Sequence, residues 1–269
     1  MSTGNACFTK APSFSPKNYP GLVAWYNVDS AIINNKTLDV LGLRDKSGNN
    51  NTLIMSNGTA SINIDDPLGI PYTNNLHINT TPLEFAKQPT GLTVFLVATN
   101  NTDNEKYQNY LTIFEDENNN PIKIGIDNVE DTIYINSDTY QNGVIIRNLN
   151  PNTSNIINAI CFNSFIDLRS DDVSSAATYQ NGLLMYYIDA TTILRINKAT
   201  NTLKITIGDD GLFPETGQPH TPLNNIIYEI IIYNHVLSES DISKINRYLG
   251  EKYNIELKNE GNFTYKENL

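Results

Sequence analysis

Residues 226–233 read Ile226-Ile227-Tyr228-Glu229-Ile230-Ile231-Ile232-Tyr233, a run that is apolar or aromatic at every position except Glu229. A strand with one face in water alternates apolar and polar residues, whereas a strand covered on both faces is apolar throughout. We therefore predict a buried strand here. Ser238 with Asp241 three residues later is a helix-capping signal, so we predict that a helix follows. The next apolar residues share one face of that helix: Ile242, Ile245 and Leu249.

The rest of the chain contains many strand signals and few helix signals. Alternation of apolar and polar residues marks short runs at 92–98, 111–114, 122–126, 133–135, 144–146, 156–162, 183–188 and 203–207. Turn-forming clusters lie between these runs, and we predict that they close antiparallel hairpins. The clusters are Asn118 to Pro121, Asn142-Gly143, Asn181-Gly182 and Asp210-Gly211. Strands at this spacing, without alternating helices, favour an antiparallel sandwich or barrel.

The tetrapeptide Tyr-Gln-Asn-Gly occurs twice, at 140–143 and 179–182. We interpret the two copies as hairpins that use the same turn chemistry rather than as a duplicated unit, because a duplication would extend over more residues.

The charge of the chain excludes some partners. Its 269 residues carry a formal net charge of -11, with a sequence pI of about 4.6. Phosphate backbones and anionic membranes would be repelled, so we expect no nucleic-acid partner. We also expect no membrane insertion, because no run approaches the roughly 20 apolar residues that cross a bilayer. The first ten residues have neither a basic start nor an apolar core, so we expect no N-terminal secretory signal.

The two cysteines, Cys7 and Cys161, are too few for a disulfide framework or a thiolate metal cage. One long-range bridge between them stays open as an alternative. We expect instead a buried Cys161 on its strand and an exposed Cys7 in a tail.

The two ends of the chain differ from the middle. Residues 1–18 contain Pro12 and Pro16 and show little periodicity, and residues 257–269 are polar. We therefore predict an N-terminal arm at 1–18, one domain at 19–256 and a C-terminal tail at 257–269. We expect the arm to tie the domain to neighbouring proteins or to further copies of the chain.

Motifs in a fixed order add a family resemblance. The segment 20–26 reads Pro-Gly-Leu-Val-Ala-Trp-Tyr, residues 43–50 read Leu-Arg-Asp-Lys-Ser-Gly-Asn-Asn, the second Tyr-Gln-Asn-Gly follows, and the strand-helix region 205–249 comes last. Together they resemble the laminin-G-like branch of the concanavalin A-like lectin/glucanase family. The resemblance implies an all-β, antiparallel jelly-roll β-sandwich with one short C-terminal helix. The family includes adhesins, carbohydrate-active enzymes and viral or phage structural proteins, so its fold alone does not fix function.

Catalytic and metal signals are weak. The paired carboxylates of a glucanase strand have no match, so we expect no enzyme activity, and we interpret Glu229 as a salt-bridged or rim-facing carboxylate. The histidines lack zinc-site spacing: His77, His220 and His235. Asp209 and Asp210, next to a glycine, are candidate calcium ligands, although a plain turn is the simpler explanation for them.

Aromatic residues supply candidate sugar platforms. Tyr107, Tyr110 and Tyr140 lie in or beside Asn-rich segments, where a ring can stack on a sugar while amides bind its hydroxyls. Simple packing at the edge of a sandwich is the competing interpretation. Trp25 lies in an apolar run, and we expect it in the core.

Three functional hypotheses follow. The first is a non-enzymatic virion structural protein, such as a minor capsid, decoration or fibre-associated module, located in the virion and able to attach to a glycan. The alternative is an extracellular or cell-surface lectin or adhesin of a low-GC microbe, because asparagine, isoleucine and tyrosine enrichment is typical of AT-rich genomes. The third is a divergent polysaccharide-active enzyme.

Overall fold

The computed structural model describes most of the strands and the C-terminal helix. Its described residues are 14–57, 60–61, 70–71, 77–80, 83–84, 91–99, 107–114, 122–127, 132–137, 140–146, 156–163, 165–166, 175–189, 196–197, 202–207 and 226–257. Side chains are described at 14–54, 91–99, 111, 177, 179–184, 207 and 226–257. The predictions for Cys7, His220, Asp209 and Asp210 fall outside these residues.

One sheet supports the helix. Its strand order is β1 (Leu22–Asn27), β20 (Ile226–Tyr233), β9 (Leu92–Ala98), β14 (Ile156–Asn163), β16 (Ser175–Gln180) and β17 (Leu183–Asp189), and β6 (Ile70–Pro71) also pairs with β20. All of these pairs are antiparallel. The strand β20 is buried from Ile227 to Tyr233, so the buried strand predicted from the sequence is confirmed.

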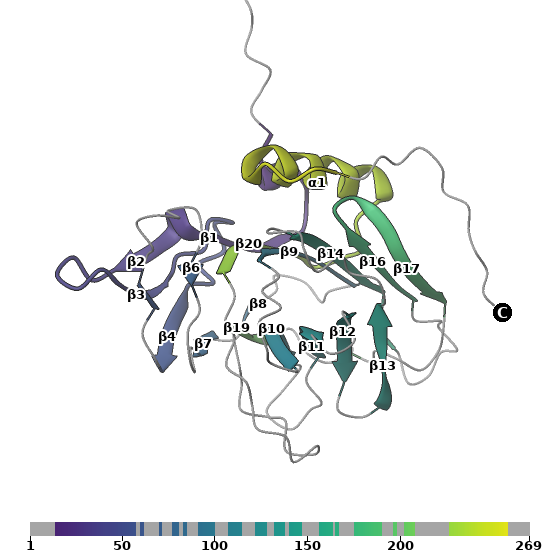
Figure 1. The fold of residues 1–269 in the computed structure, drawn as a ribbon, viewed down its shortest axis with the longest axis horizontal. Helices are drawn as coiled ribbons and strands as arrows, with labels where there is room; N and C mark the ends of the chain where they lie inside the picture. Colours follow the sequence, from purple (N-terminus) through teal and green to yellow (C-terminus); the bar gives the residue numbers. More distant parts are fainter. Residues whose placement is uncertain are drawn as a thin grey trace, which may run out of the picture.

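The second sheet forms the opposite layer. Its order is β13 (Tyr140–Ile146), β12 (Thr132–Ser137), β11 (Ile122–Asp127), β10 (Tyr107–Phe114), β19 (Thr202–Ile207), β7 (His77–Thr80), β4 (Leu53–Asn57), β3 (Asp39–Leu43) and β2 (Ala31–Ile33). β5 (Ala60–Ser61) pairs with β3, and β8 (Leu83–Glu84) pairs with β19. A parallel pair, β15 (Phe165–Ile166) and β18 (Ile196–Asn197), lies apart from both sheets, and the short 3-10 helices are η1 (Pro16–Asn18) and η2 (Val28–Ser30). Figure 1 shows the two sheets stacked, with the helix on the outer face of the first. The architecture is an all-β antiparallel sandwich with one described α-helix.

The helix α1 (Glu239–Tyr253) begins and ends where its sequence indicates. The Ser238 side chain accepts a hydrogen bond from the backbone N–H of Asp241 at 3.2 Å, and Asn254 ends the helix in the left-handed conformation with φ 53°. The predicted face is buried, as Ile242, Ile245 and Leu249 show. No helix in the described part of the chain has the length and apolar character that a bilayer crossing requires.

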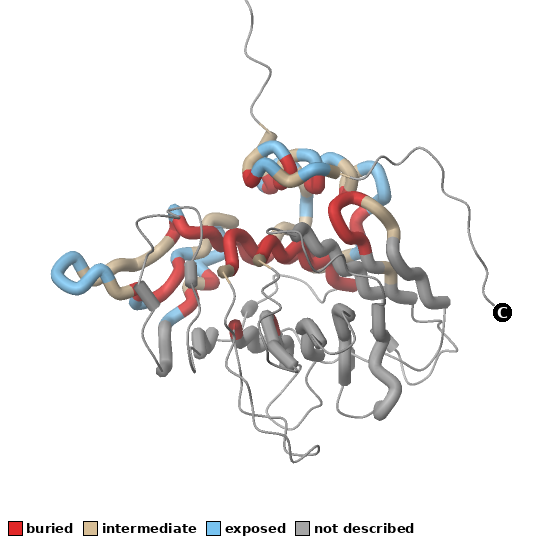
Figure 2. The backbone as a smooth tube through the Cα atoms, in the orientation of Figure 1, coloured by how far each residue is buried: buried red, intermediate tan, exposed pale blue. Residues whose placement is uncertain are grey.

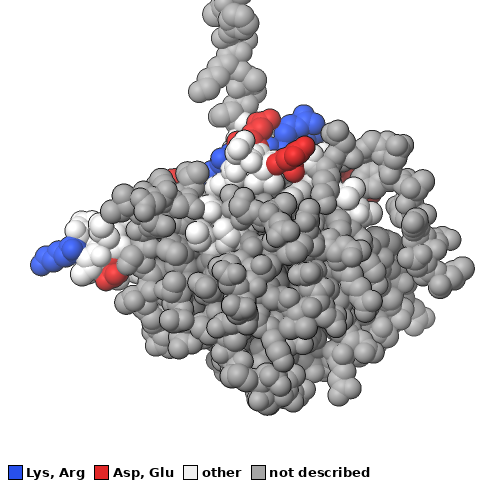
Figure 3. All heavy atoms as spheres, viewed as in Figure 1, with Lys and Arg blue, Asp and Glu red and all other residues white. Residues whose placement is uncertain are grey.

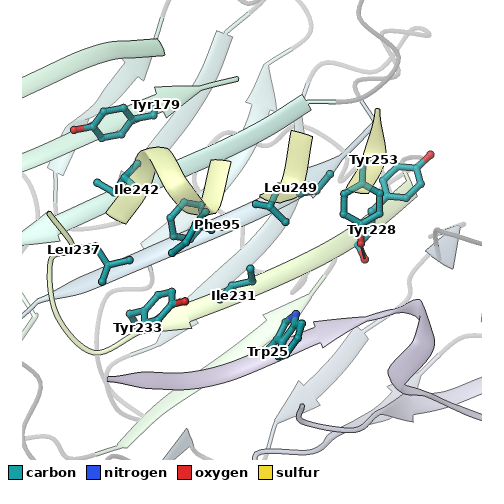
Figure 4. Close-up of a cluster of buried hydrophobic side chains, with 12 residues drawn as sticks. Trp25, Phe95, Tyr179, Tyr228, Ile231, Tyr233, Leu237, Ile242, Leu249 and Tyr253 are labelled. Carbon is teal, nitrogen blue, oxygen red and sulfur yellow. Dashed lines mark hydrogen bonds between the residues drawn. The ribbon is translucent and has the colours of Figure 1, made fainter. Parts of the chain in front are cut away.

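Apolar side chains fill the space on both sides of the first sheet. Phe95 of β9 packs with the buried face of α1 (Figure 4), and Val97 belongs to the same buried cluster. The alternate residues Val94 and Leu96 are also fully buried. Figure 2 shows this buried band along β1, β20 and β9, between α1 and the second sheet. The end of the predicted arm packs here too, since the Tyr233 hydroxyl donates to the Pro16 carbonyl at 3.0 Å. The domain boundaries stay predictions.

The predicted strand runs are confirmed, but one predicted turn is wrong. Asn181 and Gly182 form the turn between β16 and β17 with φ 49° and 83°, as expected for such a dipeptide. Asn142-Gly143 instead lies inside β13. Ser137 pairs with Tyr140 and Ile135 with Val144, so the extra residues of β13 form a bulge. Bulges and turns favour the same residues, which explains the error.

Candidate functional site

Polar groups converge on Glu229, whose side chain has no exposed surface. Its Oε1 accepts from Trp25 Nε1 at 2.6 Å and from the Tyr248 hydroxyl at 3.3 Å. Its Oε2 accepts from the Tyr253 hydroxyl at 2.6 Å and from Lys252 Nζ at 2.5 Å. We call these residues the Glu229 cluster: Trp25, Glu229, Tyr248, Lys252 and Tyr253. The interpretation of Glu229 as a salt-bridged carboxylate is confirmed.

The Glu229 cluster joins three elements. Trp25 belongs to β1 and Glu229 to β20, and the remaining members lie along one flank of α1. Burial raises the pKa of Tyr248 and of Tyr253, and the negative charge of Glu229 raises both further. Both phenols therefore stay protonated and donate to the carboxylate. Each oxygen of the buried carboxylate accepts hydrogen bonds from two donors, and these bonds compensate for the burial of its charge.

The loop 44–51 covers the free edge of β1. Asp45 Oδ1 accepts from the backbone N–H of Trp25 at 3.1 Å and from that of Ser47 at 2.8 Å. The backbone N–H of Lys46 donates to the Trp25 carbonyl at 2.8 Å, and the Asn51 side chain donates to the Val23 carbonyl at 2.9 Å. An exposed strand edge has unpaired backbone groups, and this loop satisfies them. The Asp-Lys-Ser-Gly-Asn motif therefore has a structural role.

The same loop places Lys46 beside the Glu229 cluster. Its Nζ lies 4.6 Å from the centroid of the Trp25 ring, donates to Asn27 Oδ1 at 3.2 Å, and lies 3.7 Å from Asp29 Oδ2. Burial lowers the pKa of Lys46, and the positive charge of Lys252 lowers it further, whereas Asp29 and Glu229 act in the opposite direction. The ammonium groups of Lys46 and Lys252 thus lie within each other's electrostatic field.

The predicted tyrosine platforms do not come together in one place. Tyr107 pairs with Asp127 at one end of the strand rows. Tyr140 pairs with Ser137, Ser137 pairs with Ile122, and Ile122 pairs with Ile113, so Tyr140 lies level with the opposite end of β10. The positions of Tyr107 and Ile113 are about 20 Å apart along β10. Tyr110 lies at the bulge between Asn109 and Leu111, and binding by any one of the three tyrosines stays a prediction.

No metal site emerges among the residues with described side chains. They contain no group of three His, Cys, Asp or Glu residues that could hold an ion. The half-buried His235 has its Nδ1 3.3 Å from Asn234 Oδ1. Calcium binding by Asp209 and Asp210 lies outside the described residues.

Sequence reasoning missed Lys46 and Lys252. The helical period puts Tyr248 and Lys252 on one flank of α1, which the sequence could have shown. Trp25 and Glu229 are 204 residues apart, however, and only the pairing of β1 with β20 brings them together.

Comparisons with known proteins point to the sandwich fold. No family model and no curated protein sequence matches the chain. Among solved structures, the binding domain of botulinum neurotoxin DC in complex with SialylT has a TM-score of 0.56 and 12% identity, over 85% of this chain and 51% of that chain. The binding domain of botulinum neurotoxin serotype D has a TM-score of 0.53 and 14% identity, over 84% of this chain and 51% of that one. The likeness shows the fold.

An enzyme shares this fold as well. Trypanosoma rangeli sialidase in complex with the inhibitor DANA has a TM-score of 0.55 and 12% identity, over 87% of this chain and 33% of the sialidase. The chain spans about half the length of the neurotoxin binding domains that it resembles.

Proposed function

We propose that this chain is a carbohydrate-binding, receptor-recognition domain without catalytic activity. The observation that carries the proposal is the antiparallel sandwich that the chain shares with a neurotoxin binding domain in complex with SialylT. The sialidase in complex with DANA supports the same class of ligand. We further propose that the sandwich is a jelly roll of the concanavalin A-like type, as its sequence motifs indicate, and that it acts at the surface of a cell or a virion.

The Glu229 cluster supports binding rather than catalysis. Glycoside hydrolysis generally needs two carboxylates that face the sugar, one of which donates a proton. The Glu229 side chain has no exposed surface, and each of its two carboxylate oxygens already accepts two hydrogen bonds. A carboxylate held in this way fixes α1 to the sheet and has no direction left for a substrate.

A glycan array probed with the purified chain tests the proposal. The array is run with calcium and again with a chelator. We expect saturable binding to at least one glycan, and loss of binding in the chelator would assign calcium to the site and make Asp209 and Asp210 its first candidate ligands. An array without saturable binding would contradict the proposal.

Matched variants then test the tyrosine platforms. Stacking depends on the ring rather than on the hydroxyl, so Tyr107→Ala should weaken binding whereas Tyr107→Phe should largely preserve it. The same pair of changes applies to Tyr110 and Tyr140. Unchanged affinity in an alanine variant would remove that tyrosine from the site.

A further inference from the structure

Lys46 and Lys252 have more hydrogen-bonding capacity than their contacts within the described structure use. The chain has a net charge of -11, and yet Lys46 and Lys252 are both linked to the Trp25 indole, Lys46 directly and Lys252 through Glu229. Lys46 Nζ lies 4.6 Å from the Trp25 ring centroid, and Lys252 Nζ donates to the carboxylate that accepts the Trp25 N–H. Figure 3 shows positive and negative side chains next to each other over α1.

A count of donors shows spare hydrogen-bonding capacity. An ammonium group has three N–H donors. Lys252 uses one on Glu229 Oε2 and one, at 3.4 Å, on the Tyr248 hydroxyl. Lys46 uses one on Asn27 Oδ1, and Asp29 Oδ2 at 3.7 Å is beyond normal hydrogen-bond length. Among the described residues, each ammonium therefore has at least one donor with no acceptor at hydrogen-bond distance.

Both lysine side chains are partly exposed to solvent. The side chains of Lys46 and Lys252 are 30% and 24% exposed. Among the described residues, the anion paired with Lys46 is Asp29, whose side chain is 66% exposed. An ion pair of this kind is screened by water and contributes little, so a ligand anion can displace Asp29.

We propose that Lys46 and Lys252 form a site for the carboxylate of an acidic sugar, bound beside the Trp25 ring. A carboxylate has two oxygens and can accept one charge-assisted hydrogen bond from each ammonium. The site rests on the proposed carbohydrate-binding function and specifies an acidic class of glycan for it.

Trp25 provides a direct readout because it is the single tryptophan of the chain. The full chain is titrated with N-acetylneuraminic acid and, separately, with the methyl ester of that sugar, while tryptophan fluorescence is recorded. The acid should change the emission saturably. The ester lacks the charge and should bind at least about tenfold more weakly, because its oxygens form only neutral-acceptor hydrogen bonds.

Variants at the site have opposite expected signs. Lys46→Gln removes one ammonium and should weaken binding about tenfold, whereas Lys46→Arg should stay within about threefold of the wild type. Asp29→Asn removes the competing anion and should tighten binding about twofold or more. Lys36→Gln, at an exposed lysine of the β2–β3 hairpin, removes the same charge elsewhere and should change nothing. The backbone contacts of the loop 44–51 do not involve the Lys46 side chain, so these variants should fold.

The outcomes separate the site from the general function. Wild-type affinity in Lys46→Gln, or weaker binding in Asp29→Asn, overturns the site. If the array shows glycan binding while Trp25 fluorescence and Lys46→Gln show no effect, the carbohydrate-binding function stands and this site is wrong. If neither the array nor the titration shows binding, both proposals fail.

Discussion

Trp25 connects more of the structure than any local pattern predicts. Its indole N–H donates to Glu229, its ring lies under Lys46, and its backbone N–H donates to Asp45. The sequence predicted a buried tryptophan in an apolar strand, and its burial is confirmed. The partners could not be predicted, because they depend on which strand pairs with β1.

Removing the charge of Glu229 should destabilise the fold. Glu229→Gln keeps the shape of the side chain but leaves the Lys252 ammonium without its anion and places an amide N–H₂ against other donors. We expect the free energy of unfolding to fall by about 2 to 3 kcal/mol. Urea denaturation followed by circular dichroism measures it.

Glu251→Gln is the matched control, since Glu251 is exposed on α1. Its unfolding curve should overlay that of the wild type. Equal stability of Glu229→Gln and Glu251→Gln would contradict the structural role of the Glu229 cluster.

The buried tyrosines determine how the stability of the fold should depend on pH. Burial raises the pKa of several of them above the ordinary value: Tyr26, Tyr233, Tyr248 and Tyr253. A group whose folded pKa is raised stabilises the fold fully below its unfolded pKa and loses that contribution as pH rises above it. Because unfolded tyrosine titrates near pH 10, the free energy of unfolding should fall as pH rises past about 10. Urea titrations across this range measure it, and a stability that stays constant or rises there would contradict the burial of these phenols.

At the scale of elements, sequence patterns correctly predicted the strands and helices whose formation depends on consecutive residues. The strand β20 and the helix α1 were predicted because burial, capping and helical period are written in consecutive residues. The short strands between β2 and β8 were not predicted, because each pairs over only a few residues with a strand chosen by the whole sheet. Asn142-Gly143 was assigned to a turn for a similar reason, since the register of β12 against β13 makes it a bulge.

The cap of α1 offers a test at this scale. Ser238→Ala removes the acceptor for the Asp241 N–H and should lower the free energy of unfolding by about 1 kcal/mol. Thermal denaturation of Ser238→Ala and of Ser240→Ala, an exposed serine within the first turn, measures the difference. A larger loss of stability in the Ser240 variant would show that the helix begins elsewhere.

For the whole molecule, the sequence predicted the all-β antiparallel sandwich with its C-terminal helix, and the structure and its neighbours confirm that architecture. The candidate site was harder to predict. Individual tyrosines could be chosen by residue type, but the arrangement of Lys46, Trp25 and Lys252 depends on a loop, a strand and a helix that meet only in the folded chain.

The central claim is that this sandwich binds a carbohydrate. Calorimetric titration of the purified chain with sialyllactose, and with each glycan selected on the array, tests it most directly. We predict saturable binding by the folded chain and no binding after the chain is denatured in urea. The absence of binding heat with every one of these glycans, for a chain whose circular dichroism shows it to be folded, would contradict the claim.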